Sequence, residues 1–229
     1  SSKLDPKTGG VKSLINEKEF FSTYPEIFEI ADVRIKSPFM KFSENMTPDD
    51  WIKLAKIVGK SLKDSSVKGV IITHGTDTLH FTSAALSFML GKLNKPVVLT
   101  YSQRSSDRGS SDSRLNLICS AHAALSDIAE VMLVGHATTN DDYCNALIGT
   151  KVRKMHSSRR DAFKPINTKP LAKIYPDGKI EILSVHNKRT KINVKIDAVF
   201  DNNVSLLKFY PGQDPSILDF YRKKGVKGL

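Results

Sequence analysis

The middle of the sequence alternates between short apolar runs and longer amphipathic segments, and this alternation restricts the fold more than any other feature. Residues 69–72, 96–99 and 130–134 are rich in aliphatic side chains and predict buried strands. Helical patterns lie between these runs, one through residues 79–93 and another that ends at Leu125. Short buried strands joined by amphipathic helices predict an α/β fold, in which a mostly parallel sheet is flanked by helices.

Polar segments stand at the points where ligands bind such a sheet. Residues 73–78 follow the first buried strand, residues 102–112 follow the second, and residues 43–45 lead into a helix that Thr47 caps and Pro48 begins. Ligands of open α/β sheets bind beyond the carboxyl ends of the strands. We therefore expect the chemistry of the chain in these three segments. The strands at either end of the 79–93 helix should be adjacent and parallel, joined by a right-handed crossover.

Short hairpins replace this alternation in the second part of the chain. Residues 143–155 predict two short strands that meet at Gly149. Residues 171–183 predict a hairpin that turns at Pro176, Asp177 and Gly178.

The last segment predicts one strand and one helix. Residues 206–210 have the pattern of a strand, and Asp214 with Pro215 is typical of a helix start. We expect two parts in total. An N-terminal α/β domain covers residues 1–165, and residues 166–229 hold a connecting hairpin and the beginning of a smaller C-terminal α/β domain.

The net charge of +11 is concentrated in one part of the chain. Residues 1–150 contain 17 basic and 17 acidic side chains, whereas residues 151–229 contain 18 basic and 7 acidic ones. A basic half-chain is typical of proteins that contact a polyanion such as RNA. The alternative is a solvated, lysine-rich surface, and composition alone favours that alternative.

Composition also argues against several kinds of site. Cys119 and Cys144 are the two cysteines, and neither belongs to a CxxC or Cys/His spacing, so we expect buried free thiols and no structural metal. No apolar run approaches the roughly 20 residues of a membrane-spanning helix. The pattern of a secretory signal is not visible at the N-terminus. These features favour a cytoplasmic protein.

A hydroxyl and a carboxylate stand side by side after the first buried strand. Thr76 and Asp77 follow Gly75 and open a helix, where they could activate a nucleophile and bind the amino group of a substrate. Lys154 is a candidate base, because a lysine in a dry site can accept a hydroxyl proton. The ordinary alternatives are a helix cap at Asp77 and a surface lysine in a basic run.

Ser43 and Glu44 could bind a small polar substrate through a hydroxyl and a carboxylate. Their alternative is a loop that only leads into the Thr47 cap. If the site exists, Thr76 Oγ1 and Lys154 Nζ should lie roughly 2.7–3.2 Å apart, or be bridged by one water. Asp77 should then face the same side as Ser43 and Glu44.

The combination of motifs resembles one superfamily. Residues 74–78 read HGTDT, which is similar to the signature of the asparaginases, and residues 154–163 (KMHSSRRDAF) resemble their lysine-bearing motif. Within that superfamily, three further stretches are similar to the D-type subunit (GatD) of archaeal glutamyl-tRNA(Gln) amidotransferases. They are residues 43–46 (SENM), 102–112 (SQRSSDRGSSD) and 208–212 (KFYPG). The resemblance extends over the whole chain.

The resemblance implies a role for each candidate residue. Thr76, Asp77 and Lys154 would be catalytic and form the second triad of the family. Ser43, Glu44 and Asp77 would hold the α-amino and α-carboxyl groups of the substrate amino acid.

The resemblance also implies an activity and partners. The intact protein would release ammonia from glutamine (or asparagine) for the conversion of Glu-tRNA(Gln) to Gln-tRNA(Gln), without a metal or organic cofactor of its own. The partner E-type amidotransferase subunit would use ATP and Mg, and tRNA(Gln) would bind the complex. A homodimer within a heterotetramer is expected. Two alternatives remain open: a stand-alone cytosolic L-asparaginase, and a truncated, non-catalytic module.

The family also carries a first threonine, in a GGTI motif, which is its usual acyl-forming nucleophile. Residues 1–10 (SSKLDPKTGG) resemble the mobile loop just after that motif, with Pro6 where relatives often carry a tyrosine. We therefore expect both ends of the chain to be cut, so that the nucleophilic threonine and the rest of the C-terminal domain are missing. The 229 residues by themselves should be inactive.

Overall fold

The chain divides into two compact units, Ser1–Ala198 and Val199–Leu229, in a computed structural model that describes residues 2–4, 11–13 and 17–229. Within these residues, the first unit holds a six-stranded sheet. Its strands in chain order are β3 (Val70–Thr73), β4 (Val97–Thr100), β5 (Val131–His136), β6 (Cys144–Ile148), β9 (Ala172–Ile174) and β10 (Ile180–Ile182). In space they follow the order β10-β9-β6-β5-β4-β3.

The first three strands of this main sheet are parallel. β3 pairs with β4 from Val70 opposite Val97, and β4 pairs with β5 from Val97 opposite Val131. The expectation that the first two buried strands are adjacent and parallel is confirmed. β5–β6, β6–β9 and β9–β10 are antiparallel, so the sheet is mixed.

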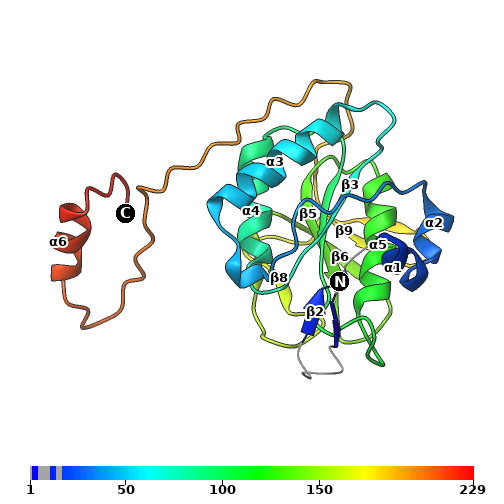
Figure 1. The fold of residues 1–229 in the computed structure, drawn as a ribbon, viewed down its shortest axis with the longest axis horizontal. Coiled ribbons are helices and arrows are strands. Elements are labelled where there is room, and N and C mark those ends of the chain that lie inside the picture. Colours follow the sequence, from blue (N-terminus) through cyan, green and yellow to red (C-terminus); the bar gives the residue numbers. More distant parts are fainter. Residues whose placement is uncertain (1, 5–10, 14–16) are drawn as a thin grey trace. The chain divides into compact units, whose positions relative to one another are not determined.

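Helices cover both faces of the main sheet (Figure 1). α3 (Pro48–Lys63) and α4 (Leu79–Leu90) pack on one face, and α5 (Ser113–Leu125) packs on the other. α2 (Glu26–Ile30), which follows α1 (Glu17–Thr23), packs on the outer side of α5. Alternate strand residues serve the two faces. Those beside α3 and α4 include Val97, Leu99, Val131 and Leu133, and those beside α5 include Val98, Met132 and Val134.

Two short antiparallel pairs lie outside the main sheet in the described part of the chain. β1 (Ser2–Leu4) pairs with β2 (Val11–Ser13), and β7 (Val152–Lys154) pairs with β8 (Phe163–Pro165). β7 follows β6 after a tight turn at Gly149, as the sequence predicts. An alanine Cβ at Gly149 would lie 2.7 Å from Ser87 Oγ and 3.0 Å from two backbone oxygens, so the turn needs glycine.

The β9–β10 hairpin corrects the predicted domain boundary. It turns at Asp177 and Gly178 as expected, but β9 pairs with β6 and so belongs to the main sheet. The first compact unit therefore extends to Ala198 and does not end at residue 165. A hairpin pattern identifies two strands that pair with each other, yet it carries no information on which distant strand they join.

The second unit contains α6 (Ser216–Lys223), close to the helix that Asp214 and Pro215 predict. The predicted strand at residues 206–210 is wrong. In the described 199–229 segment, the nearest strand-like pairing is a single bridge between Val204 and Gly228. The run has the composition of a strand, but a ladder also needs a partner backbone.

Three predictions from the composition can be compared with the described residues. Cys119 and Cys144 are both buried and free, as expected. In that part of the chain, no group of His, Cys, Asp or Glu side chains is placed to hold a metal ion. Among the same residues, no helix combines the length and the apolar character that crossing a membrane requires.

Candidate amidase site

The turn between β3 and α4 brings Thr76 and Asp77 to the carboxyl edge of the main sheet. His74 N donates to Thr100 O at 3.0 Å, so the chain leaves β3 beside the end of β4. α4 then begins at Leu79, where its first backbone N–H groups have no acceptors within the helix. The turn therefore places a hydroxyl and a carboxylate at the end of a strand and the start of a helix.

Ser43 packs directly against this turn, within the one-turn helix η1 (Ser43–Asn45). Its hydroxyl accepts a hydrogen bond from Asp77 N (3.2 Å) and lies 3.5 Å from Asp77 Oδ2, and its carbonyl accepts from Thr78 Oγ1 (2.6 Å). The approach requires a glycine, because a Cβ on Gly75 would lie 2.7 Å from Ser43 Oγ. Ser43 itself is 3 % exposed, so it is fixed in place.

Lys154 reaches the turn from the β7–β8 hairpin, 78 residues further along the chain than Thr76. Its Nζ donates to Thr76 Oγ1 at 2.8 Å and to Asp77 Oδ1 at 2.9 Å. The predicted distance between Thr76 and Lys154 is confirmed. The Lys154 side chain is 12 % exposed, whereas that of Asp77 is 61 % exposed. The lysine is thus nearly enclosed, and the carboxylate is open to a ligand.

His74 supports the turn from behind through a short hydrogen-bond chain. Trp51 Nε1 donates to Thr82 Oγ1, which lies 2.9 Å from His74 Nε2, and His74 Nδ1 lies 2.7 Å from Gly75 O. The carbonyl of Gly75 can only accept, so Nδ1 carries the proton. Burial lowers the pKa of His74 below its usual 6.5, against the bond to Gly75 O. The ring is therefore neutral and accepts from Thr82.

The remaining predicted residue has a looser place. Glu44 follows Ser43 in η1 and is exposed, on the segment that contacts the Asp77 turn. The structure thus brings Thr76, Asp77, Lys154 and Ser43 into direct contact and leaves Glu44 at the side. The roles that the resemblance implies for these five residues stay predictions.

The polar loop at residues 102–112 is folded around one buried carboxylate. Asp112 accepts hydrogen bonds from Ser102 Oγ and from the backbone N–H groups of Gln103 and Arg104, at 2.9–3.0 Å. Asp112 has no exposed surface, and it fixes the start of the loop beside the end of β4. The base of this polar stretch is therefore an ordered part of the protein interior.

The matched region of a known family contains both parts of this site. The family model described as "Asparaginase, N-terminal" matches residues 1–188. The chain belongs to the asparaginase family. Its HGTDT turn and its lysine hairpin both lie within the matched residues.

Relatives in this family include proteins named as the D-type subunit of glutamyl-tRNA(Gln) amidotransferase. That of Pyrococcus abyssi is 51% identical over the whole chain, and that of Archaeoglobus fulgidus is 48% identical over the whole chain. The chain covers 52% and 54% of these two proteins. It therefore spans about half the length of the curated relatives that it matches.

Solved asparaginases share the fold. The thermostable L-asparaginase from Thermococcus kodakarensis is 25% identical with a TM-score of 0.76, over 97% of this chain and 64% of that one. A probable cytoplasmic L-asparaginase from Campylobacter jejuni is 28% identical with a TM-score of 0.73, over 92% and 66%. The α/β fold that the alternation predicts is thus the asparaginase fold.

Sequence reasoning gave no role to several residues that build the site. His74 lies within the HGTDT motif, but its partner Thr82 and the Trp51 that donates to Thr82 are on two different helices. Their positions at helical spacing indicate only that they lie near the buried face of α3 or α4. A buried tryptophan needs an acceptor for its N–H, and that requirement was the available signal.

Proposed function

We propose that the intact protein is the amidase subunit, of the D type, in a glutamyl-tRNA(Gln) amidotransferase. The proposal rests on the similarity of the whole chain to proteins of that name, which are 51% and 50% identical to it. The contact of 2.8 Å between Thr76 Oγ1 and Lys154 Nζ supports it. The matched length includes every element that carries the site. The substrate is glutamine or asparagine, whose side-chain amide is hydrolysed to release ammonia.

The geometry suits this reaction. In the amine form, Lys154 accepts the hydroxyl proton of Thr76 along the contact of 2.8 Å. Asp77 presents an exposed carboxylate that can hold the substrate α-amino group, with Ser43 and Glu44 beside it. A threonine hydroxyl oxygen attacks the amide carbonyl, the C–N bond breaks as ammonia leaves with the hydroxyl proton, and water then hydrolyses the ester acyl-enzyme to the acid and the free hydroxyl. A threonine outside these residues forms the acyl bond, by the family resemblance, and Thr76 with Lys154 is the second triad.

The proposal includes the assembly. Ammonia passes to a partner E-type subunit, which uses ATP and Mg to amidate glutamate on tRNA(Gln), while the amidase subunit needs no cofactor of its own. A homodimer of the amidase subunit stands within a heterotetramer in the cytoplasm. The buried free thiols of Cys119 and Cys144 are compatible with a reducing compartment.

The test uses a chain extended at both ends to the length of the curated relatives, with and without the E-type partner. Ammonia release from glutamine and formation of Gln-tRNA(Gln) should both occur in the complex. Residues 1–229 alone should release no ammonia, and comparable rates from the short and long chains would show that the acyl-forming nucleophile lies within the short one. If the complex shows neither ammonia release nor Gln-tRNA(Gln) formation, the proposed function is wrong.

A stand-alone L-asparaginase is the second candidate, since solved structures that resemble this fold include L-asparaginases. That enzyme would release ammonia from asparagine at full rate without a partner and would form no Gln-tRNA(Gln). A non-catalytic module would bind the partner and release no ammonia from either amino acid.

A further inference from the structure

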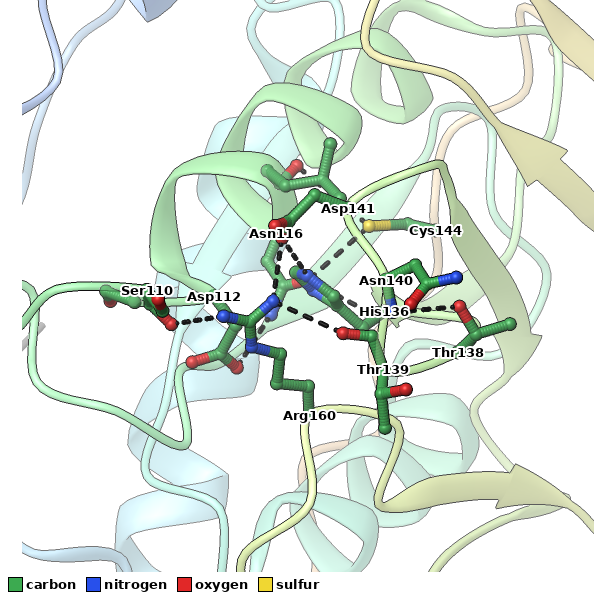
Figure 2. Close-up of polar contacts among 12 residues, drawn as sticks. Ser110, Asp112, Asn116, His136, Thr138, Thr139, Asn140, Asp141, Cys144 and Arg160 are labelled. Carbon is green, nitrogen blue, oxygen red and sulfur yellow. Dashed lines mark hydrogen bonds and ion pairs between the residues drawn. The ribbon is translucent and has the colours of Figure 1, made fainter.

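A second polar cluster joins two loops to the guanidinium of Arg160 (Figure 2). Arg160 lies in the loop between β7 and β8, six residues after Lys154. Its side chain donates to Asp141 Oδ1 (3.0 Å), Thr139 O (3.3 Å) and Ser110 O (2.5 Å). One side chain thus connects the hairpin of Lys154 with the 102–112 loop and with the loop that follows β5.

The hairpin depends on contacts of this kind, because a two-stranded hairpin is marginally stable by itself. Its pairing sets Lys154 opposite Phe163, and Phe163 packs against the Tyr101 ring at 4.6 Å between centroids. Tyr101 Oη also donates to Arg160 O at 2.7 Å. Arg160 is therefore held through its backbone by Tyr101, which follows β4, and through its side chain by two loops, and that side chain is only 18 % exposed.

Buried His136 links the same cluster to α5. Asn116 Oδ1 accepts from His136 N at 2.9 Å, and Asn116 Nδ2 donates to Tyr101 O at 3.0 Å, so the amide orientation of Asn116 is determined. His136 Nδ1 lies 2.6 Å from that oxygen, and its Nε2 lies 3.0 Å from Asp141 Oδ1. Both ring nitrogens face acceptors, and both can donate only when the ring carries two protons.

Asp141 Oδ1 is the atom that the His136 ring and the Arg160 guanidinium both contact. The hydrogen bond from His136 lowers the pKa of the Asp141 carboxyl, desolvation opposes this, and Arg160 lowers it further. The other ionisable groups around His136 are Asp112 on α5, Cys144 on β6 and Tyr101 after β4, and burial raises the pKa of the Cys144 thiol and of the Tyr101 phenol. The ionisable group that contacts the His136 ring is thus the carboxylate of Asp141.

We propose that Arg160 is a positioning residue of the amidase centre, which fixes the Lys154 hairpin over the carboxyl ends of β4 and β5, and that His136 supports it through the Asp141 carboxylate that both side chains contact. This inference rests on the proposed function, because it concerns the placement of Lys154. The side-chain hydrogen bonds of Arg160 reach the two neighbouring loops, away from Thr76 and Lys154. Its effect reaches the reaction through the backbone of the hairpin.

The kinetic test uses the full-length protein in complex with its partner subunit. Arg160→Gln should lower kcat for ammonia release by about 10-fold to 100-fold, since small misplacements of a catalytic group have effects of that size. KM should stay within about threefold, because Ser43 and Asp77 lie on other elements. Arg160→Lys keeps one contact to Asp141 and should give an intermediate kcat. Equal kcat values for Arg160→Gln and the parent protein would overturn the proposal.

The matched control is Arg34→Gln. Arg34 also donates to a carboxylate and a hydroxyl, those of Asp64 and Ser66, but it lies outside this cluster and its side chain is 61 % exposed. Its kcat should be unchanged. If Arg160→Gln does not fold, Asp141→Asn takes its place, because the exposed Asp141 carboxylate can be changed while the backbone acceptors of Arg160 remain. Asp141→Asn should also lower kcat.

A second measurement does not require turnover. The rate at which an amine reagent labels Lys154, followed by mass spectrometry, should rise several-fold in Arg160→Gln and not in Arg34→Gln, since Lys154 is nearly enclosed in the parent protein. An unchanged labelling rate overturns the positioning role. If the parent complex releases no ammonia, the proposed function fails, and this labelling still decides the role of Arg160.

Discussion

The two halves of the proposed amidase site are supported in different ways. Thr76 and Asp77 stand on a turn between a strand of the main sheet and a helix, and their place follows from the parallel pairing of β3 with β4. Lys154 stands on the β7–β8 hairpin, which pairs with no strand of the main sheet in the described residues. Sheet topology therefore positions the first half, and side-chain contacts position the second.

This difference predicts two kinds of defect. Damage to the turn should weaken the hold on the substrate, because Ser43 and Asp77 meet there. Damage to the hairpin should slow the chemical step, because it displaces Lys154 from Thr76. The separation of kcat from KM in variants of each region tests the comparison.

The largest effect is expected at Lys154. Lys154→Met removes the group that contacts both Thr76 and Asp77, and kcat for ammonia release should fall on the order of 1000-fold or more, as for a member of a catalytic unit. Lys151→Met is the control, since Lys151 is an exposed lysine in the turn just before β7. Similar rates for the two variants in an ammonia assay would remove Lys154 from the mechanism.

A smaller effect, of the other kind, is expected at Gly75. In Gly75→Ala the new Cβ would lie 2.7 Å from Ser43 Oγ and 2.8 Å from Ser43 Cβ, so the serine must move. KM for glutamine should rise by about tenfold, roughly the loss of one hydrogen bond to a charged group. The control is Gly109→Ala, where a Cβ meets nothing within 4 Å. A change confined to kcat would contradict the comparison.

The hairpin should also lose measurable stability when one anchor is removed. Tyr101→Phe deletes the hydrogen bond to Arg160 O, and the free energy of unfolding in urea should fall by about 1 kcal/mol. Tyr210→Phe is the matched change at a tyrosine that is 59 % exposed. Equal stability of the two variants would show that the Tyr101 hydroxyl does not hold the loop.

The smallest effect concerns the turn and its buried histidine. The pKa of His74 in the fold is below its usual 6.5, because burial disfavours the charged ring. As the pH falls below 6.5, the unfolded chain therefore binds the proton first, and the free energy of unfolding declines until the folded pKa is passed. Urea titrations between pH 7 and 5 should show this decline in the parent protein. They should show it in the exposed control His156→Gln as well, and less of it in His74→Gln.

The sequence predicts those parts that depend on local pattern. Short aliphatic runs predicted β3, β4 and β5, the turn at Gly149 predicted the junction between β6 and β7, and the turn at Gly178 predicted the β9–β10 hairpin. The HGTDT resemblance located the turn, and the lysine motif led to the contact between Thr76 and Lys154. Each of these features depends on a few consecutive residues.

The parts that were missed depend on contacts between distant segments. The 206–210 run lacks a partner strand, and the β9–β10 hairpin joins β6, so neither placement could be read from its own residues. Arg160 belongs to a basic run in the sequence, and its three acceptors come from two other loops. Long-range side-chain contacts of this kind leave no periodic signal.

The separate β7–β8 hairpin has a consequence for how the protein responds to heat. Regions with few ladder bonds open locally at a lower free energy than the core of a sheet. Opening of the hairpin parts Lys154 from Thr76 while β3, β4 and β5 remain folded. Amide hydrolysis should therefore stop at a lower temperature than that of cooperative unfolding, and hydrogen exchange in residues 152–165 should quicken over the same interval.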